Sequence, residues 1–70
     1  MFIQIKIGTR FHTALNETWK CVNMDVRHGL GDTTTWLHLE KESDKNILEL
    51  MPIEMVINSI KENGTKILET

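Results

Sequence analysis

Several features that mark secreted, membrane or nucleic-acid-coating proteins are missing from this sequence. Its single cysteine, Cys21, excludes an intramolecular disulfide and favours a reducing compartment. No apolar run is long enough to span a bilayer. The N-terminal residues MFIQIKIGTR alternate apolar and polar side chains, unlike the continuous apolar centre of a signal peptide. We therefore expect a cytoplasmic protein with no membrane contact.

An excess of positive charge is also missing. Eight Lys and Arg residues stand against ten Asp and Glu residues, which gives a net charge of −2. This balance argues against a protein that coats nucleic acid through a strongly basic surface. The acids gather in the second half of the chain, where one group comprises Glu40, Glu42, Asp44 and Glu49. We interpret this group as solvated surface, with a basic partner as the functional alternative.

The length and composition indicate one folded unit. A chain of 70 residues removes only about 60% of its unfolded surface from water and cannot divide that burial between two cores. With 40% hydrophobic residues, 26% charged residues and one proline, the composition is that of a folded globular domain. We expect residues 1–70 to form a single compact domain.

Hydrophobic periodicity predicts a chain that is mainly β. Phe2–Ile7 puts Ile3, Ile5 and Ile7 on one side, which is typical of a half-buried strand. Turn-forming residues bound the other expected strands, which cover about residues 9–15, 19–27 and 34–42 and the segment after SDKN.

Matching apolar residues across strands predicts the registers, because a slip of one residue moves every side chain to the other face. Across the HGLGDT loop this rule pairs Arg27 with Thr34, Met24 with Leu37 and Val22 with Leu39. At the neighbouring turns it pairs Phe11 with Val22 and Leu39 with Leu50. The result is an antiparallel meander with one apolar face.

Residues 52–63 have the pattern of an amphipathic helix. Pro52 suits the first helical position, and Gly64 suits a left-handed position just after the last turn. The apolar residues of one stripe are Ile53, Val56, Ile57 and Ile60. A short closing strand, Lys66–Glu69, is expected beside the N-terminal strand. The predicted fold class is mainly β (α+β): a small bent antiparallel sheet or barrel of about five strands, one C-terminal helix and a short final strand.

The order of elements and the hydrophobic phasing carry a resemblance. The segments GTRF, WKCVNMD, WLHLE and ILELMPIEMVINSIKENG, within residues 8–64, resemble the small SH3-like β-barrel accessory domains of phage and transposase proteins. The resemblance implies an SH3-like barrel that is non-catalytic and binds proteins or nucleic acid.

The predicted registers leave a mixed aromatic and polar set on the outer face. This set is Arg10, His12, Trp19, Cys21, Asn23, Asp25, Arg27, Trp36 and His38. Aromatic rings among polar groups are typical of contact surfaces. With Leu30, which the HGLGDT loop presents at its tip, the predicted partner-binding residues are Arg10, His12, Trp19, Arg27, Leu30, Trp36 and His38.

A core position for at least one tryptophan is the alternative, because each ring is a large share of the apolar surface of so small a protein. Trp36 is the better candidate for exposure, since its neighbours Asp25 and His38 are polar. Trp19 lies beside a turn over which its ring can fold.

Catalytic and metal-binding patterns are incomplete. Asp25 and His38 can approach diagonally across two strands, but the pattern supplies no nucleophile, oxyanion donor or pocket. Cys21 beside His12 is more typical of a half-buried cysteine than of an activated thiolate. One cysteine and three separated histidines, one of them His28 at a turn, lack the paired spacing of zinc sites. We expect no enzyme activity, no metal and no cofactor.

Three functions stay open. The leading interpretation is a non-catalytic protein-interaction module, such as a regulatory or accessory protein of a phage or mobile element. The alternative is a nucleic-acid-binding barrel with Arg10, Lys20 and Arg27 near phosphates and Trp36 stacked on a base. The third is a homodimer or larger homo-oligomer that buries the tryptophan face or the edge of Phe2–Ile7. The acidic balance puts a protein partner first.

Overall fold

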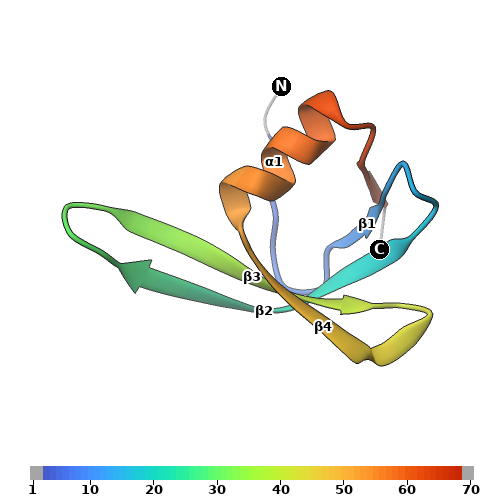
Figure 1. Ribbon diagram of the computed structural model, residues 1–70, viewed down its shortest axis with the longest axis horizontal. Coiled ribbons are helices and arrows are strands. Elements are labelled where there is room, and N and C mark those ends of the chain that lie inside the picture. The colour runs from blue at the N-terminus through green and yellow to red at the C-terminus, as the bar shows by residue number, and fades with distance from the viewer. Residues whose placement is uncertain (1–2, 69–70) are drawn as a thin grey trace.

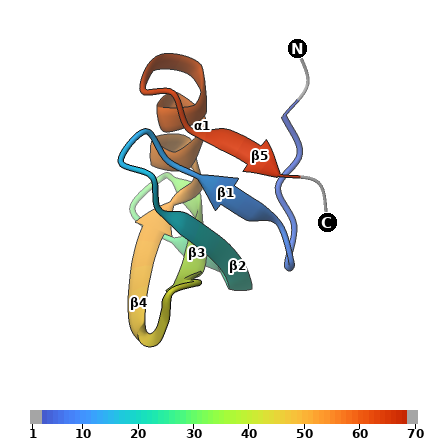
Figure 2. The same cartoon turned by 90° about the vertical axis from the view of Figure 1, so that its right-hand side faces the viewer.

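The computed structural model describes residues 3–68 as one open, antiparallel five-stranded sheet with a single helix (Figure 1). The elements in chain order are β1 (Arg10–His12), β2 (Thr18–His28), β3 (Thr33–Lys41), β4 (Asp44–Pro52), α1 (Ile53–Glu62) and β5 (Lys66–Leu68). Their order across the sheet is β4-β3-β2-β1-β5 (Figure 2). The predicted mainly β class is confirmed, and the sheet takes the open form and not the barrel.

The N-terminal segment differs from the predicted strand. Residues 3–6 have no regular secondary structure, and a turn follows at Ile7 and Gly8. Ile5 is buried while Ile7 is 60% exposed, so the alternation does not define one buried face. The closing strand β5 pairs with β1 and not with the N-terminal segment. The predicted pairing of the two terminal segments is wrong, because β5 pairs with the edge of β1 instead. Phe2 and Glu69, each an end residue of one predicted strand, lie outside the described residues.

The turn between β1 and β2 is longer than the predicted pair of Phe11 with Val22 requires. The Thr13 N–H donates to the Glu17 carbonyl at 2.8 Å, and Asn16 takes a positive φ of 62°. This turn therefore begins at Thr13, and it places Phe11 opposite Trp19 instead of Val22. The predicted inward direction of Phe11 is nevertheless confirmed, because its side chain is buried.

A β-bulge divides the ladder between β2 and β3. From the loop to the pair of Asn23 with His38, the register is the predicted one. It then shifts, and Cys21 lies opposite Leu39, which leaves Val22 as the extra residue. A single extra residue exchanges the two faces of the strand beyond it. The predicted outward direction of Cys21 and Trp19 is therefore wrong.

The register between β3 and β4 differs by one residue from the prediction. Leu39 lies opposite Glu49, and His38 lies opposite Leu50. Leu48 and Leu50 consequently lie on the outer face, where they are 63% and 42% exposed. Near the turn, residues 45–47 have no partner in β3. Such a bulge in an edge strand hinders pairing with another chain.

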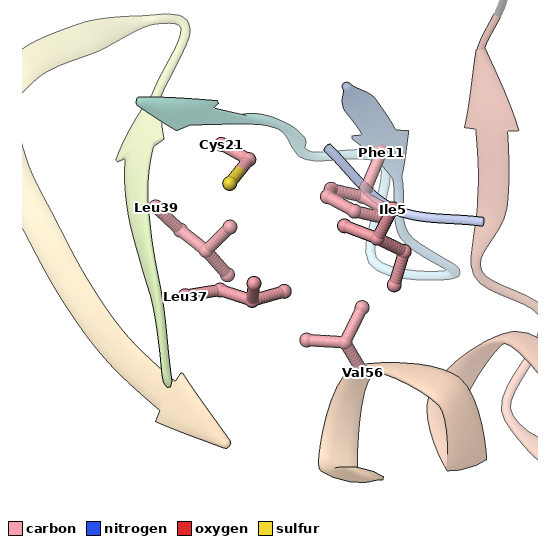
Figure 3. Packing of buried hydrophobic residues seen from close by; sticks show 6 residues of the cluster. All are labelled: Ile5, Phe11, Cys21, Leu37, Leu39 and Val56. Carbon is pink, nitrogen blue, oxygen red and sulfur yellow. The ribbon is translucent and has the colours of Figure 1, made fainter. Parts of the chain in front are cut away.

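The helix α1 packs on the inner face of the sheet. Pro52 has an extended backbone and caps the helix, so the first helical residue is Ile53, one position after the predicted start at Pro52. Val56 is buried, and the rest of the predicted stripe packs against the core. The helix ends as predicted, with Gly64 at a φ of 78°. The buried hydrophobic residues are Ile5, Phe11, Cys21, Leu37, Leu39 and Val56 (Figure 3).

Helix α1 covers only part of the sheet. The far end of the β2–β3 hairpin extends beyond it as an arm (Figure 1). On this arm Val26 is 58% exposed, and Leu30 at the tip is fully exposed. The outer face of β2, β3 and β4, on the side away from α1, carries no further layer of described secondary structure. The fold therefore leaves this face open to contact.

Candidate interaction surface

Four side chains meet on the outer face of the β2–β3 hairpin. The Nε2 atom of His38 lies 2.5 Å from Oδ2 of Asp25. The Arg27 guanidinium lies 3.9 Å from the same oxygen, and its central carbon is 5.3 Å from the centroid of the Trp36 ring. We call Asp25, Arg27, Trp36 and His38 the Trp36 cluster.

The regular part of the β2–β3 ladder produces this cluster. Asp25 lies directly opposite Trp36. Arg27 is the diagonal neighbour of Trp36, and His38 is the diagonal neighbour of Asp25, both within reach of long side chains. Asp25, Arg27 and His38 are about a third to a half exposed, and Trp36 is half-buried. The Arg27 guanidinium near the Trp36 ring and the hydrogen bond between Asp25 and His38 restrict the rotamers of these side chains, so less freedom is lost on binding. The cluster is therefore both accessible and ordered.

An apolar hollow adjoins the Trp36 cluster at His38. Its volume is about 220 Å³, and its lining residues are Val22, Asn23, His38, Leu48, Glu49 and Leu50. The bulge turns Val22 outward, and the shifted β3–β4 register turns both leucines outward. Apolar area beside an arginine and an aromatic ring is the composition of a binding hot spot.

Sequence reasoning missed Val22, Leu48 and Leu50 as members of this surface. Apolar matching assigned them to the inner face, because it pairs leucine with leucine in preference to the observed pair of Leu39 with Glu49. At an edge strand the glutamate can reach solvent, so the rule fails there. No local signal in the sequence marks the bulge at Val22.

The remaining predicted residues lie apart from the Trp36 cluster. Arg10 and His12 share the outer face but belong to β1, on the far side of β2. Two nitrogens of the Arg10 guanidinium donate to the Glu42 carboxylate, each at 2.9 Å, and His12 is hydrogen-bonded to Thr18. Leu30 is at the tip of the arm.

Trp19 lies on the opposite face of the sheet from Trp36. Its ring packs against the core, with the Lys41 amino group 5.9 Å from the ring centroid. That amino group also forms an ion pair with Glu17 at 2.7 Å. Trp19 therefore belongs to the inner layer of the protein.

The Cys21 thiol is part of the packed core. Cys21 is buried, and its thiol donates a hydrogen bond to the Asn23 carbonyl. Burial raises the pKa of the Cys21 thiol, and the hydrogen bond with Asn23 only partly opposes this effect. Such a thiol is a poor nucleophile at neutral pH.

Within residues 3–68, no group of three or more His, Cys, Asp or Glu side chains is placed to hold a metal ion. The helix of this described region is also too short and too polar to cross a membrane.

Comparison with known proteins finds no family model, curated protein or solved structure that matches the chain. The geometry of the outer face is therefore the basis for the functional argument.

Proposed function

We propose that this chain is a non-catalytic protein-interaction module whose partner binds the outer face of β2, β3 and β4. The observation that carries the proposal is the Trp36 cluster beside the apolar hollow, on the side of the sheet away from α1. The aromatic ring and the hollow supply apolar area, and the polar groups around them set the orientation of a partner.

The ion pairs favour a protein over nucleic acid as the partner. Of the three cations expected near phosphates, Arg10 is held by Glu42 and Arg27 lies close to Asp25. A phosphate would have to displace or approach these carboxylates, which is unfavourable for two negative groups. The net charge of −2 acts in the same direction.

The proposal includes a regulatory or accessory role in a phage or mobile element. Only the sequence resemblance supports this part of it. A cytoplasmic location is part of the proposal because the single cysteine favours a reducing compartment. If the partner is a second copy of this chain, the same face forms a homodimer.

Affinity capture with matched variants tests the proposal. Immobilised wild type, Trp36→Ala and Leu15→Ala are compared after circular dichroism has shown that each is folded. Leu15 is 82% exposed in the β1–β2 turn and so controls for the loss of an exposed apolar side chain elsewhere. We expect Trp36→Ala to lose the captured partner and Leu15→Ala to keep it; equal capture by the folded variants would remove the outer face as the site.

Salt dependence and mass separate the alternatives. Binding through several phosphates weakens by orders of magnitude between about 50 and about 200 mM salt, whereas an aromatic protein contact changes far less. Light scattering on the purified chain reports whether the partner is a second copy. A dimer that Trp36→Ala converts to a monomer would assign the face to self-association.

A further inference from the structure

A second hollow lies on the other side of the sheet, between α1 and the strands. We call it the inner cavity; its volume is about 220 Å³. Its apolar lining consists of Phe11, Trp19, Leu39, Met51 and Val56. Its polar lining consists of Thr13, Glu17, Glu49, Ser59 and Thr65. The cavity is thus a mainly apolar space with carboxylate and hydroxyl groups around it.

Three side chains that line the inner cavity belong to the buried core of the protein. Phe11, Leu39 and Val56 are core residues that are at most 5% exposed, and they come from three different elements. A space bounded by packed core side chains is largely formed before a ligand arrives. Its volume is below the usual range of drug-sized pockets, about 300–1,000 Å³, so it suits a ligand with one ring or a short alkyl chain.

The charges around the inner cavity are not balanced. Glu17 and Glu49 both line it. Glu17 is neutralised by Lys41, whose amino group lies 2.7 Å from its carboxylate. Within residues 3–68, Glu49 takes part in no ion pair. One uncompensated negative charge beside an apolar space favours a ligand with one positive charge.

We propose that the inner cavity binds a small amphiphilic amine, with the apolar body against Trp19 and Val56 and the ammonium group beside Glu49. The hydroxyls of Ser59 and Thr65, 2.6 Å apart, bond to each other and are neutral, so the Glu49 carboxylate is the stronger acceptor for the ammonium. This site lies on the opposite face from the Trp36 cluster, and Glu49 is the one residue that lines both this cavity and the outer hollow.

The test uses three probes of one size that differ in charge: benzylamine, benzyl alcohol and benzoate. Each is titrated into the ¹⁵N-labelled protein, and binding is followed by amide chemical shifts. Fluorescence in a Trp36→Phe background gives a second readout, because only Trp19 then emits. We expect benzylamine to bind roughly two- to fivefold more tightly than benzyl alcohol at low salt, the ratio that a solvent-accessible ion pair supplies. Benzoate should bind most weakly.

Two variants locate the binding. Glu49→Gln, at an exposed position, should remove the preference for the amine without loss of folding. Val56→Leu adds bulk inside the cavity and should weaken all three probes. Because Glu49 also lines the outer hollow, the amides of Thr13, Ser59 and Thr65 should shift while those of Asn23 and His38 do not.

Several results would overturn the proposal whatever the fate of the partner surface. These are no binding of benzylamine at millimolar concentration, equal affinity for the three probes, an amine preference that survives in Glu49→Gln, or shifts confined to the outer face. Loss of partner capture in Trp36→Ala has no bearing on this site, so the two proposals fail separately.

Discussion

Cys21 lies directly opposite Leu39, and both side chains are buried, whereas the adjacent Val22 opens onto the outer hollow with Leu48 and Leu50. This pairing sets the two faces of the protein. It brings Trp19 into the inner layer and keeps Trp36 on the outer face, although both rings belong to one hairpin.

The thiol of Cys21 should be unreactive in the native state and should make stability depend on alkaline pH. Its pKa is raised in the folded protein above the ordinary value of 9.0. The folded state therefore keeps the thiol proton where the unfolded state loses it, so the contribution of Cys21 to stability should be constant below about pH 8 and should fall as pH rises through 9. Urea unfolding at several pH values measures the slope.

Cys21→Ala is the control for this slope. The variant should lose the part of the alkaline decline that belongs to the thiol. Ellman's reagent should label wild type only after unfolding. Rapid labelling of the native protein would show that the thiol is accessible and that the bulge is misplaced.

Deletion of Val22 should be tolerated, because this residue has no partner in β3. Its removal joins the pair of Cys21 with Leu39 directly to the pair of Asn23 with His38 and preserves the face of every other side chain. The deletion removes the contacts of one half-exposed side chain. Apart from that loss, we expect the free energy of unfolding to change by about 1 kcal/mol or less. Thermal and urea unfolding measure it.

Deletion of Asp25 is the matched control, since it lies in the regular part of the same ladder. Its loss moves the residues on one side of the gap to the wrong face. This variant should fail to fold. If both deletions were equally damaging, the ladder would contain no bulge at Val22.

The two tryptophans should differ in their effect on stability. Trp19→Ala removes a ring that packs against the core. It should lower the free energy of unfolding by about 2–4 kcal/mol, somewhat less than a fully buried ring, because Trp19 is partly exposed. Trp36→Ala should cost about 1 kcal/mol, since its ring lies among polar groups on the outer face. Urea unfolding of each variant gives the two values; a larger loss for Trp36 would mean that this ring is the core residue.

The hydrogen bond between Asp25 and His38 should orient the cluster more than it stabilises the fold. Both side chains are more than a third exposed, so their coupling should be below about 1 kcal/mol. A double-mutant cycle with Asp25→Asn and His38→Gln measures the coupling. Asp25→Asn should nevertheless weaken partner capture, because Arg27 and His38 lose the carboxylate that positions them. A coupling of several kcal/mol would instead indicate a structural pair.

Local patterns in the sequence predicted much of the fold. The helix follows from the spacing of Val56 and its apolar neighbours, and the arm follows from the alternation on both sides of HGLGDT. These segments are regular, and near neighbours in the sequence decide their structure. The outward direction of Trp36 was predicted from the register of the arm alone, and Trp36 does lie on the outer face.

Features that depend on distant contacts could not be predicted in the same way. The bulge at Val22 depends on how α1 and the N-terminal segment fill the core, and the pair of Leu39 with Glu49 depends on β4 being an edge strand. Apolar matching treats each strand as regular and interior. It therefore misplaced Trp19 and failed to identify Leu48 and Leu50 as members of the outer surface.

The most direct test of the central claim is photo-crosslinking from two adjacent positions in β3. Thr34 shares the outer face with Trp36, and Thr35 points to the inner face, because successive residues of a strand alternate. Benzoylphenylalanine is placed at each position in turn, and the captured partner is identified by mass spectrometry. We predict crosslinks from Thr34 and not from Thr35; crosslinks from Thr35 alone, from both equally or from neither would contradict an outer-face partner surface.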